Sequence, residues 1–210
     1  MFAPQETSRD FRDVKIRLTI SPINTERSAM TKPFAAIEPA AIRRVLGQFA
    51  TGVTIITTRS PDGRAVGITA NSFSSVSLDP PLVLWSLARS SSSYAAFAAA
   101  RYWAIHILAQ EQEALSGRFA SRGIDRFAGV PTRNGIGDTP LIEGCVGWLQ
   151  CERAVQYDGG DHAIFLGEVR SFTQRQDAAP LVFHGGQYRR LASADASALP
   201  LRETGGALAV

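Results

Sequence analysis

The chain has 210 residues, of which 45% are hydrophobic and 20% are charged, and its formal net charge at pH 7 is +3. This composition is ordinary for a globular protein, and the length predicts a single domain with a core of its own. The mild charge argues against nucleic acid as the main partner, and no apolar run approaches the roughly 20 residues of a membrane-spanning helix.

The first element that the sequence predicts is a helix beginning near Pro39. Before it, residues 1–35 mix charge, proline and hydroxyl side chains without sustained periodicity, so we expect a flexible extension, with Met30 as an alternative start. Apolar residues then recur at helical spacing and form one stripe: Ile42, Val45, Leu46 and Phe49. The helix is expected to end near Gly52.

Strands dominate the next part of the chain. Rich β-branched content predicts strands at 53–58 and 65–70, and the Ser-Pro-Asp-Gly turn between them makes the pair a hairpin. Further strands are expected at 81–88 and 102–109. A short helix that begins with serines, at 91–100, separates these two.

The last third of the domain continues the same pattern. We expect a helix at 110–120, a long loop at 121–141, two long strands at 144–157 and 162–173, and a short hairpin at 181–191. The segment 192–210 is rich in Ala, Ser and Gly and reads as a disordered tail. The whole predicts one domain over 36–191, mainly β, as an antiparallel barrel with a few peripheral helices.

Cysteine and histidine usage gives no sign of a metal site. Cys145 and Cys151 would point to one face of a strand but lie too far apart to bond, so we expect two buried thiols in a reducing compartment. His106, His162 and His184 do not have metal-ligand spacing. The chain also opens without a basic region followed by an apolar one, so we expect no secretory signal and a cytoplasmic protein.

Familiar catalytic and nucleotide-binding motifs are missing from the sequence. No G-x-G-x-x-G follows a strand, and neither a P-loop nor a G-x-S-x-G motif occurs. No local pattern nominates a nucleophile or an acid-base residue. Any cofactor must therefore be held in another way.

The segment "TANSFSSVSLDPP", residues 69–81, has an unusually polar middle. One interpretation is a solvated loop with capping side chains. The other is that a flat, heteroatom-rich ring such as a flavin lies against the segment and accepts its free N–H groups. The side chains concerned are Thr69, Asn71, Ser72, Ser74, Ser75 and Ser77.

A second polar cluster follows one strand later, where Arg89 precedes four consecutive serines, 90–93. Plain N-capping of the short helix needs only one of these serines. The alternative is an anion site, because free N–H groups at a helix start favour a phosphate. A site for a flat ring and a site for a phosphate, separated by one expected strand in the sequence, would together suit a flavin nucleotide.

Five stretches give the sequence a family resemblance. It resembles the flavin reductases that serve two-component flavin monooxygenases, which have an FMN-binding split-barrel fold. The resemblance runs from about residue 37 to 191 and is most specific in "TANSFSSVSLDPP". One departure is His106, where such strands more often carry Asn. The stretches are "FATGVTIITT" (49–58), "GITANSFSSVSLDPPLV" (67–83), "HILAQEQ" (106–112), "CERAVQYDGGDHAIFLGEV" (151–169) and "PLVFHGGQYRRL" (180–191).

The resemblance implies a set of site residues. Those expected to hold the flavin ring are Thr51, Gly52, Val53, Thr69, Ala70, Asn71 and Ser72. Those expected at its other side or along the ribityl chain are Ser75, Ser77 and Leu78. Those expected near the phosphate are Ala88, Arg89 and Ser93. His162 and Phe165 are expected to face the nicotinamide.

The function implied by the resemblance is hydride transfer from NADH or NADPH to FMN or FAD. Hydride transfer requires the nicotinamide and flavin rings to be stacked at close distance and does not require an acid-base residue. The lack of such a residue is therefore compatible with this function. The reduced flavin would pass to a separate monooxygenase, and a second copy of the chain would complete a homodimer. The alternative is a flavin-binding protein without reductase activity, such as a sensor or storage module.

Overall fold

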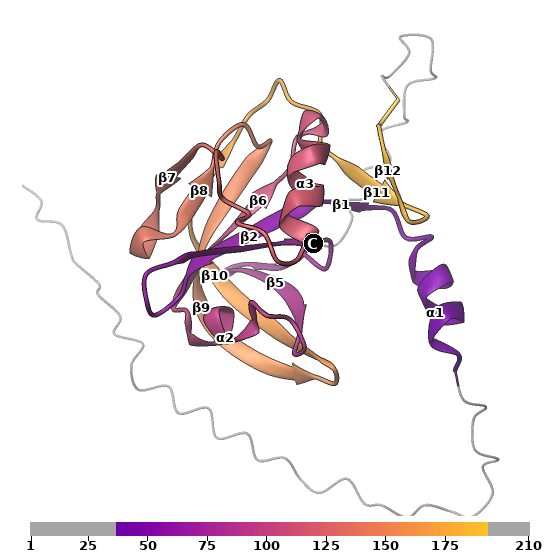
Figure 1. The fold of residues 1–210 in the computed structure, drawn as a ribbon, viewed down its shortest axis with the longest axis horizontal. Coiled ribbons are helices and arrows are strands. Elements are labelled where there is room, and N and C mark those ends of the chain that lie inside the picture. The colour runs from indigo at the N-terminus through magenta and orange to yellow at the C-terminus, as the bar shows by residue number, and fades with distance from the viewer. Residues whose placement is uncertain (1–36, 193–210) are drawn as a thin grey trace, which may run out of the picture. The chain divides into compact units, whose positions relative to one another are not determined.

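The computed structural model describes residues 37–192. The flexible extension expected over 1–35 lies outside the described residues. So does the disordered tail expected over 192–210, apart from Ala192. Within the described range, strands dominate and every strand pair is antiparallel, as the sequence pattern predicts (Figure 1). The mainly β fold with few helices is confirmed.

One seven-stranded sheet forms the body of the fold. Two long hairpins contribute four of its strands, and the β-branched and alternating patterns of their sequences explain why they pair. In spatial order the sheet contains β3 (Ala65–Ala70), β2 (Thr54–Arg59), β6 (Tyr102–Ile107), β9 (Gly147–Gly159), β10 (His162–Gln174), β5 (Pro81–Ala88) and β4 (Ser74–Leu78).

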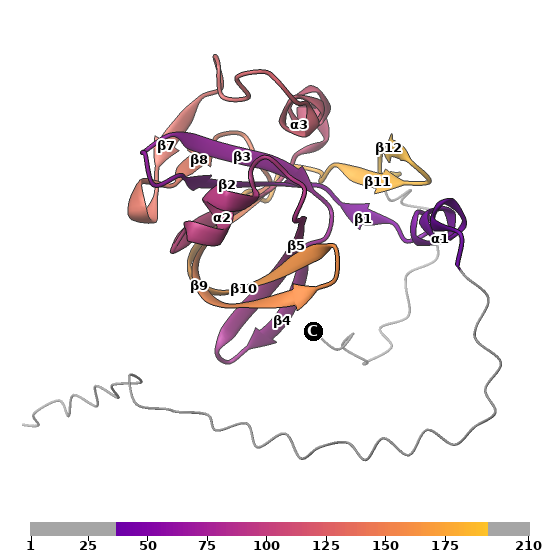
Figure 2. The same cartoon turned by 60° about the horizontal axis from the view of Figure 1, so that its bottom comes forward.

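The two edge strands of this sheet, β3 and β4, are consecutive in sequence. Only residues 71–73 join them, and a chain advances at most about 3.6 Å per residue, so Ala70 and Ser74 lie within about 14 Å of each other. The sheet must therefore curl until its edges approach, although they are not paired with each other (Figure 2). This is a barrel with a split, and the polar "NSF" segment crosses the split.

Smaller elements flank the large sheet. The short strands are β1 (Thr51–Gly52), β11 (Val182–His184) and β12 (Gln187–Arg189) in one sheet, and β7 (Thr132–Asn134) and β8 (Pro140–Ile142) in another. The helices are α1 (Pro39–Leu46), α2 (Tyr94–Ala99) and α3 (Glu113–Ala120), with short 3-10 turns at η2 (Gln110–Gln112) and η3 (Ile136–Asp138).

The core is divided between two clusters of buried side chains. The first is aromatic: Trp85 stacks on Phe165 with ring centroids 4.5 Å apart, and Trp103 meets both rings edge-on. The second includes Ile55 from β2 and Phe119 from α3. Each aromatic side chain buries a large apolar area, so these residues hold the strands of the barrel together.

Four local expectations differ from the structure. The first helix ends at Leu46 rather than near Gly52, and Thr51–Gly52 form the strand β1. Residues 74–78 form the edge strand β4 rather than a loop, because their backbone pairs with β5. The expected loop 121–141 contains β7, η3 and the start of β8, whose pairing needs no long apolar run. Cys145 precedes β9 and lies in a different core cluster from Cys151, so the two do not share a strand.

Both cysteines are nevertheless buried free thiols. Burial raises the pKa of Cys145 to about 11 and that of Cys151 to about 12. A thiol with so high a pKa is almost entirely protonated at neutral pH and is a poor nucleophile. These residues therefore serve packing.

Candidate functional site

The two segments predicted to hold a flavin ring meet in the structure. Thr51, Gly52 and Val53 lead directly into β2, and the first residue of that strand, Thr54, pairs with Ala70 at the end of β3. The Thr54 hydroxyl also donates to the carbonyl oxygen of Ala70 at 2.6 Å. The hairpin therefore brings residues 51–53 beside residues 69–72 at the split of the barrel.

Several polar side chains of this region bond to the protein itself. The Thr69 hydroxyl donates to the carbonyl oxygen of Ser116 on α3 at 2.6 Å. The Ser72 hydroxyl bonds to both the N–H and the carbonyl oxygen of Ser86, each at 3.0 Å, and so extends the edge of β5 where β4 has not yet begun. These two side chains shape the backbone across the split. Asn71 between them is exposed and has no hydrogen-bond partner among residues 37–192.

The predicted ribityl-side residues lie on the edge strand. A bulge between Ser75 and Ser77 interrupts the pairing of β4 with β5, which changes the direction of the side chains along the strand. Ser75 and Leu78 are exposed, and Ser77 is half-buried. The strand therefore presents hydroxyl groups next to an exposed leucine.

The serine run joins β5 to α2. In the described range, the backbone N–H groups of Ser90 and Ser92 have no acceptor, whereas those of Ser91 and Ser93 do. Helix α2 has only six residues, so its dipole alone is too small to make an anion site. Any anion bound here must draw on charged neighbours.

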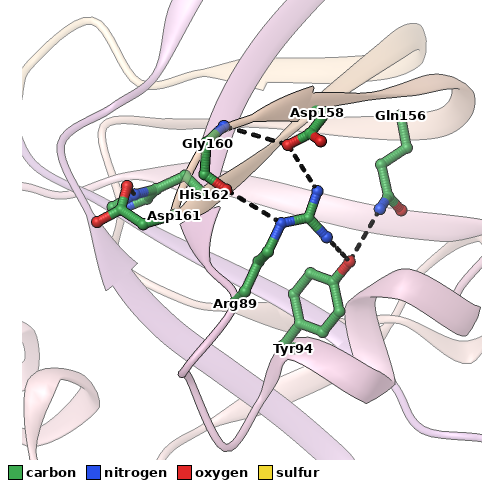
Figure 3. A network of polar contacts seen from close by, with 7 residues as sticks. All are labelled: Arg89, Tyr94, Gln156, Asp158, Gly160, Asp161 and His162. Carbon is green, nitrogen blue, oxygen red and sulfur yellow. Dashed lines mark hydrogen bonds and ion pairs between the residues drawn. The ribbon is translucent and has the colours of Figure 1, made fainter.

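The Arg89 side chain is directed at the turn between β9 and β10 (Figure 3). Its guanidinium donates to the Asp158 carboxylate at 3.0 Å, to the Gly160 carbonyl oxygen at 3.3 Å and to the Tyr94 hydroxyl at 3.1 Å. The hydrogen bond from Arg89 holds the pKa of the Asp158 carboxyl below its usual value, so the pair is charged at neutral pH and its net charge is zero. A phosphate would have to compete with Asp158 for this arginine.

His162 begins β10 on the same side of the molecule. It lies opposite Ala88 across the β5–β10 pairing, and the Arg89 N–H donates to the carbonyl oxygen of Asp161 at 2.9 Å. The His162 side chain is 44% exposed, and its Nδ1 lies 2.7 Å from the Asp161 carboxylate. The structure thus brings His162 next to Ala88 and Arg89, two of the residues predicted for the phosphate end.

Phe165, the second residue predicted for the nicotinamide, lies in the aromatic core. Its side chain is fully buried and stacks on Trp85. A side chain enclosed in this way has no free face for a ligand. We do not retain Phe165 in the candidate site.

Arg126, which lies in the coil between α3 and β7, is not among the residues predicted from the sequence. A groove of about 980 Å³ is lined by Arg126, by Ser92 and Ser93, and by the β2–β3 hairpin. Of the predicted cofactor residues only Ser93 lines this groove, so the groove adjoins the serine run and not the predicted ring contacts. Nothing in the local sequence marks Arg126, because it lies in a stretch without periodicity or a known motif.

Two further observations concern metals and membranes. Among residues 37–192, no group of three His, Cys, Asp or Glu side chains is arranged to hold a metal ion. The helices of the described range include none with the length and apolarity required to cross a membrane.

Known proteins resemble this chain over most of its length. An FMN reductase (NADH), SmoA, from Agrobacterium fabrum (strain C58) is 45% identical over 150 residues, which cover 71% of this chain and 84% of that protein. The reductase subunit HsaB of a flavin-dependent monooxygenase from Rhodococcus jostii (strain RHA1) is 41% identical and covers 73% and 78%. The chain also matches 47% of the length of a trigonelline monooxygenase reductase component from Acinetobacter baylyi, at 46% identity.

Solved structures and a family model agree with these relatives. The NADH:FAD oxidoreductase SgcE6 of Streptomyces globisporus C-1027, solved with NAD and FAD fragments, superposes with a TM-score of 0.71 at 39% identity, over 76% of this chain and 99% of that one. The family model described as "Flavin reductase like domain" matches residues 46–192. The chain therefore belongs to the family of flavin reductase-like domains.

Proposed function

We propose that this protein is an NAD(P)H-dependent flavin reductase that delivers reduced flavin to a separate monooxygenase. The observation that carries the proposal is the meeting of residues 51–53 with residues 69–72 at the split, where Ser72 bonds to Ser86 on β5, the strand that leads to the serine run and pairs with β10 at His162. Relatives named as an NADH-dependent FMN reductase and as monooxygenase reductase subunits support it. FMN or FAD would be the flavin, and NADH or NADPH the electron donor.

The residues present fit a flavin nucleotide. Thr51 Oγ1 is buried without a hydrogen-bond partner among the described residues, and a polar ring atom would satisfy it. Asn71 is exposed and unpaired in the same range, and the free N–H groups of Ser90 and Ser92 suit a phosphate. A bound flavin supplies the ring that accepts hydride from the nicotinamide.

The residues of the chain then have positioning and electrostatic tasks. The backbone of residues 69–72, held by the Thr69 and Ser72 side chains, would donate N–H groups to the negative charge that develops on the ring. His162 would contact the nicotinamide and hold it against the ring. No residue has to accept a proton for hydride transfer, so a site without an acid-base pair is sufficient.

Two further properties belong to the proposal. Exposed apolar side chains on α1 and along β4, β9 and β10 suggest that a second copy of the chain covers them in a homodimer. The free thiols of Cys145 and Cys151 suit a reducing compartment, which supports a cytoplasmic protein.

The reductase activity is tested by mixing the protein with NADH and following the nicotinamide absorbance. We expect oxidation only when FMN, FAD or riboflavin is present, and faster than in the enzyme-free mixture. Repeating the assay with NADPH identifies the preferred donor. Flavin binding without accelerated oxidation of either donor would instead favour the non-catalytic sensor or storage protein.

A further inference from the structure

The groove beside the serine run contains a cation with no carboxylate partner. Arg126 is half-buried, and within residues 37–192 its guanidinium bonds only to neutral acceptors. Nε and Nη2 donate to the Ser121 carbonyl oxygen at 2.9 and 2.7 Å, and Nη1 donates to the Gly67 carbonyl oxygen at 2.7 Å. A further, longer contact of 3.3 Å joins Nη1 to the Ser93 hydroxyl.

Four other charged groups line the groove, and only two of them form an ion pair with each other. Arg64 pairs with Asp62 at 2.7 Å. Arg59, like Arg126, donates only to neutral acceptors, the Asp138 and Gly63 carbonyl oxygens and the Asn134 side chain, but none of these acceptors belongs to the serine run. The Asp125 carboxylate accepts the N–H of Phe127 at 3.0 Å.

Arg126 therefore differs from Arg89, the arginine that sequence suggests for the phosphate. Arg89 does not line the groove and is neutralised by Asp158. Arg126 retains its full charge, and burial lowers the pKa of its guanidinium, which shows that the surroundings disfavour the uncompensated cation. A bound anion would relieve that cost.

The location of Arg126 also suits one end of a flavin nucleotide. Its contact Ser93 belongs to the serine run, and Ser92, whose N–H is free in the described range, lines the same groove. Its contact, the carbonyl oxygen of Gly67, lies two residues before Thr69 on the edge strand β3, about 7 Å along the strand. A five-carbon ribityl chain can bridge that distance between a ring near residues 69–72 and a phosphate near Ser93.

We propose that Arg126, with Ser92 and Ser93, binds the phosphate of the flavin nucleotide, and that Arg89 does not. The proposal rests on the flavin reductase function proposed above and adds to it the residue that distinguishes a phosphorylated flavin from riboflavin. A guanidinium donates charge-assisted hydrogen bonds to phosphate, and these are stronger than neutral ones.

The test compares FMN with riboflavin, which lacks the phosphate, in Arg126→Gln. Dissociation constants are measured by quenching of flavin fluorescence. We expect FMN affinity to fall on the order of tenfold or more while riboflavin affinity changes less than about twofold. Arg126→Lys, which keeps the charge, should recover part of the loss for FMN.

The matched control is Arg64→Gln, which removes the same charge from the same groove at a residue that is already paired with Asp62. It should leave the ratio of FMN to riboflavin affinity unchanged. Arg89→Gln is the second comparison, and it should also leave that ratio unchanged. Thermal unfolding of each variant shows whether it is folded.

The outcomes separate this proposal from the reductase function. Equal loss of both flavins in a folded Arg126→Gln variant overturns the phosphate role, and so does a selective loss of FMN in Arg89→Gln. In either case wild-type protein that still oxidises NADH with riboflavin leaves the reductase function standing. If the wild type does not accelerate NADH or NADPH oxidation with any of these flavins, the reductase function itself fails.

Discussion

His106 is a fully buried histidine whose two ring nitrogens are both bonded to the backbone. Nε2 accepts the N–H of Ile142 at 3.0 Å, so the proton must be on Nδ1, which lies 3.0 Å from the Ile55 carbonyl oxygen and donates to it. Burial lowers the pKa of His106 to about 4, and the hydrogen bond to Ile55 opposes this only in part. The residue ties β6 to β2 and β8 in its neutral form and is a structural histidine.

This burial makes stability depend on pH. Because the pKa of His106 is lower in the folded than in the unfolded protein, the unfolded state takes up a proton first, and stability present above the unfolded value of 6.5 is lost as pH falls toward 4. We expect a loss on the order of 2 kcal/mol between pH 7 and pH 5 in the free energy of unfolding by urea. His106→Asn, which offers a donor and an acceptor but does not titrate, should remove most of this slope. An unchanged slope in the variant would assign the pH dependence to other groups.

Gly67 on β3 lies against the aromatic rings of Phe119 and Phe127. A Cβ at this position would stand 2.5 Å from Phe119 Cε1 and 3.1 Å from Phe127 Cζ, both too close. We expect Gly67→Ala to lower the free energy of unfolding by about 1–3 kcal/mol, because the buried Phe119 ring must shift. Denaturant unfolding measures this. The control is Gly117→Ala on α3, where a Cβ meets nothing within 4 Å and alanine should be neutral or stabilising.

Hydrogen bonds from Arg89 hold the turn between β9 and β10 against the end of β5. Arg89 bonds to Asp158 and Gly160, and the Gln156 amide shares the Tyr94 hydroxyl with it at 3.1 Å (Figure 3). The turn leads directly into His162. Arg89 is therefore suited to position the residue proposed to contact the nicotinamide.

Arg89→Ala should release this turn. We expect the KM for NADH to rise, or hydride transfer to slow, by roughly threefold or more, because His162 is less well positioned. FMN and riboflavin affinities should change alike. Stopped-flow reduction and flavin titration separate the two effects, and His162→Ala should give the same kinetic signature without loss of flavin affinity.

The control for this experiment is Arg170→Ala on the same strand, β10. Arg170 pairs with Glu152 and Glu168 on the surface, away from the turn. Its removal should leave NADH kinetics unchanged. Normal NADH kinetics in Arg89→Ala would show that the hydrogen bonds from Arg89 to the turn do not position His162.

Considered as a whole, the molecule leaves apolar side chains uncovered. Helix α1 buries none of its residues, and Val45, Leu46 and Phe49 are 70%, 65% and 76% exposed. An isolated eight-residue helix is marginal in water, so a helix with an uncovered apolar stripe is more stable when a partner surface covers it. The proposed homodimer would provide that surface.

We expect light scattering at micromolar concentration to give the mass of a dimer. Replacing Val45 and Leu46 together with Glu should shift the protein toward the monomer mass without unfolding it, because both side chains are exposed in the single chain. Arg44→Glu, which alters charge on the same helix, should leave the dimer intact. A monomer mass for the wild type would contradict the homodimer.

The sequence by itself determined the elements that local chemistry controls. Apolar spacing located α1, β-branched runs and Gly-containing turns located both long hairpins, and the polar composition of 69–81 pointed to a flavin-binding segment. These features depend on residues that are close together in the sequence, and each residue type has its own preference for helix, strand or turn. The local pattern is therefore sufficient to predict them. Family resemblance then supplied the split barrel and the cofactor.

Only the tertiary structure decided which charges are free and which side chains are enclosed. Arg89 and Arg126 are alike in sequence, but Asp158 comes from a hairpin some seventy positions further along the chain and neutralises the first of them. Phe165 is an apolar residue that is buried against Trp85 of the neighbouring strand β5, and His106 is structural because Ile55 and Ile142 come from two other strands. Ion pairing, stacking and burial join residues distant in the chain, and the pattern around any single residue carries no information about such partners.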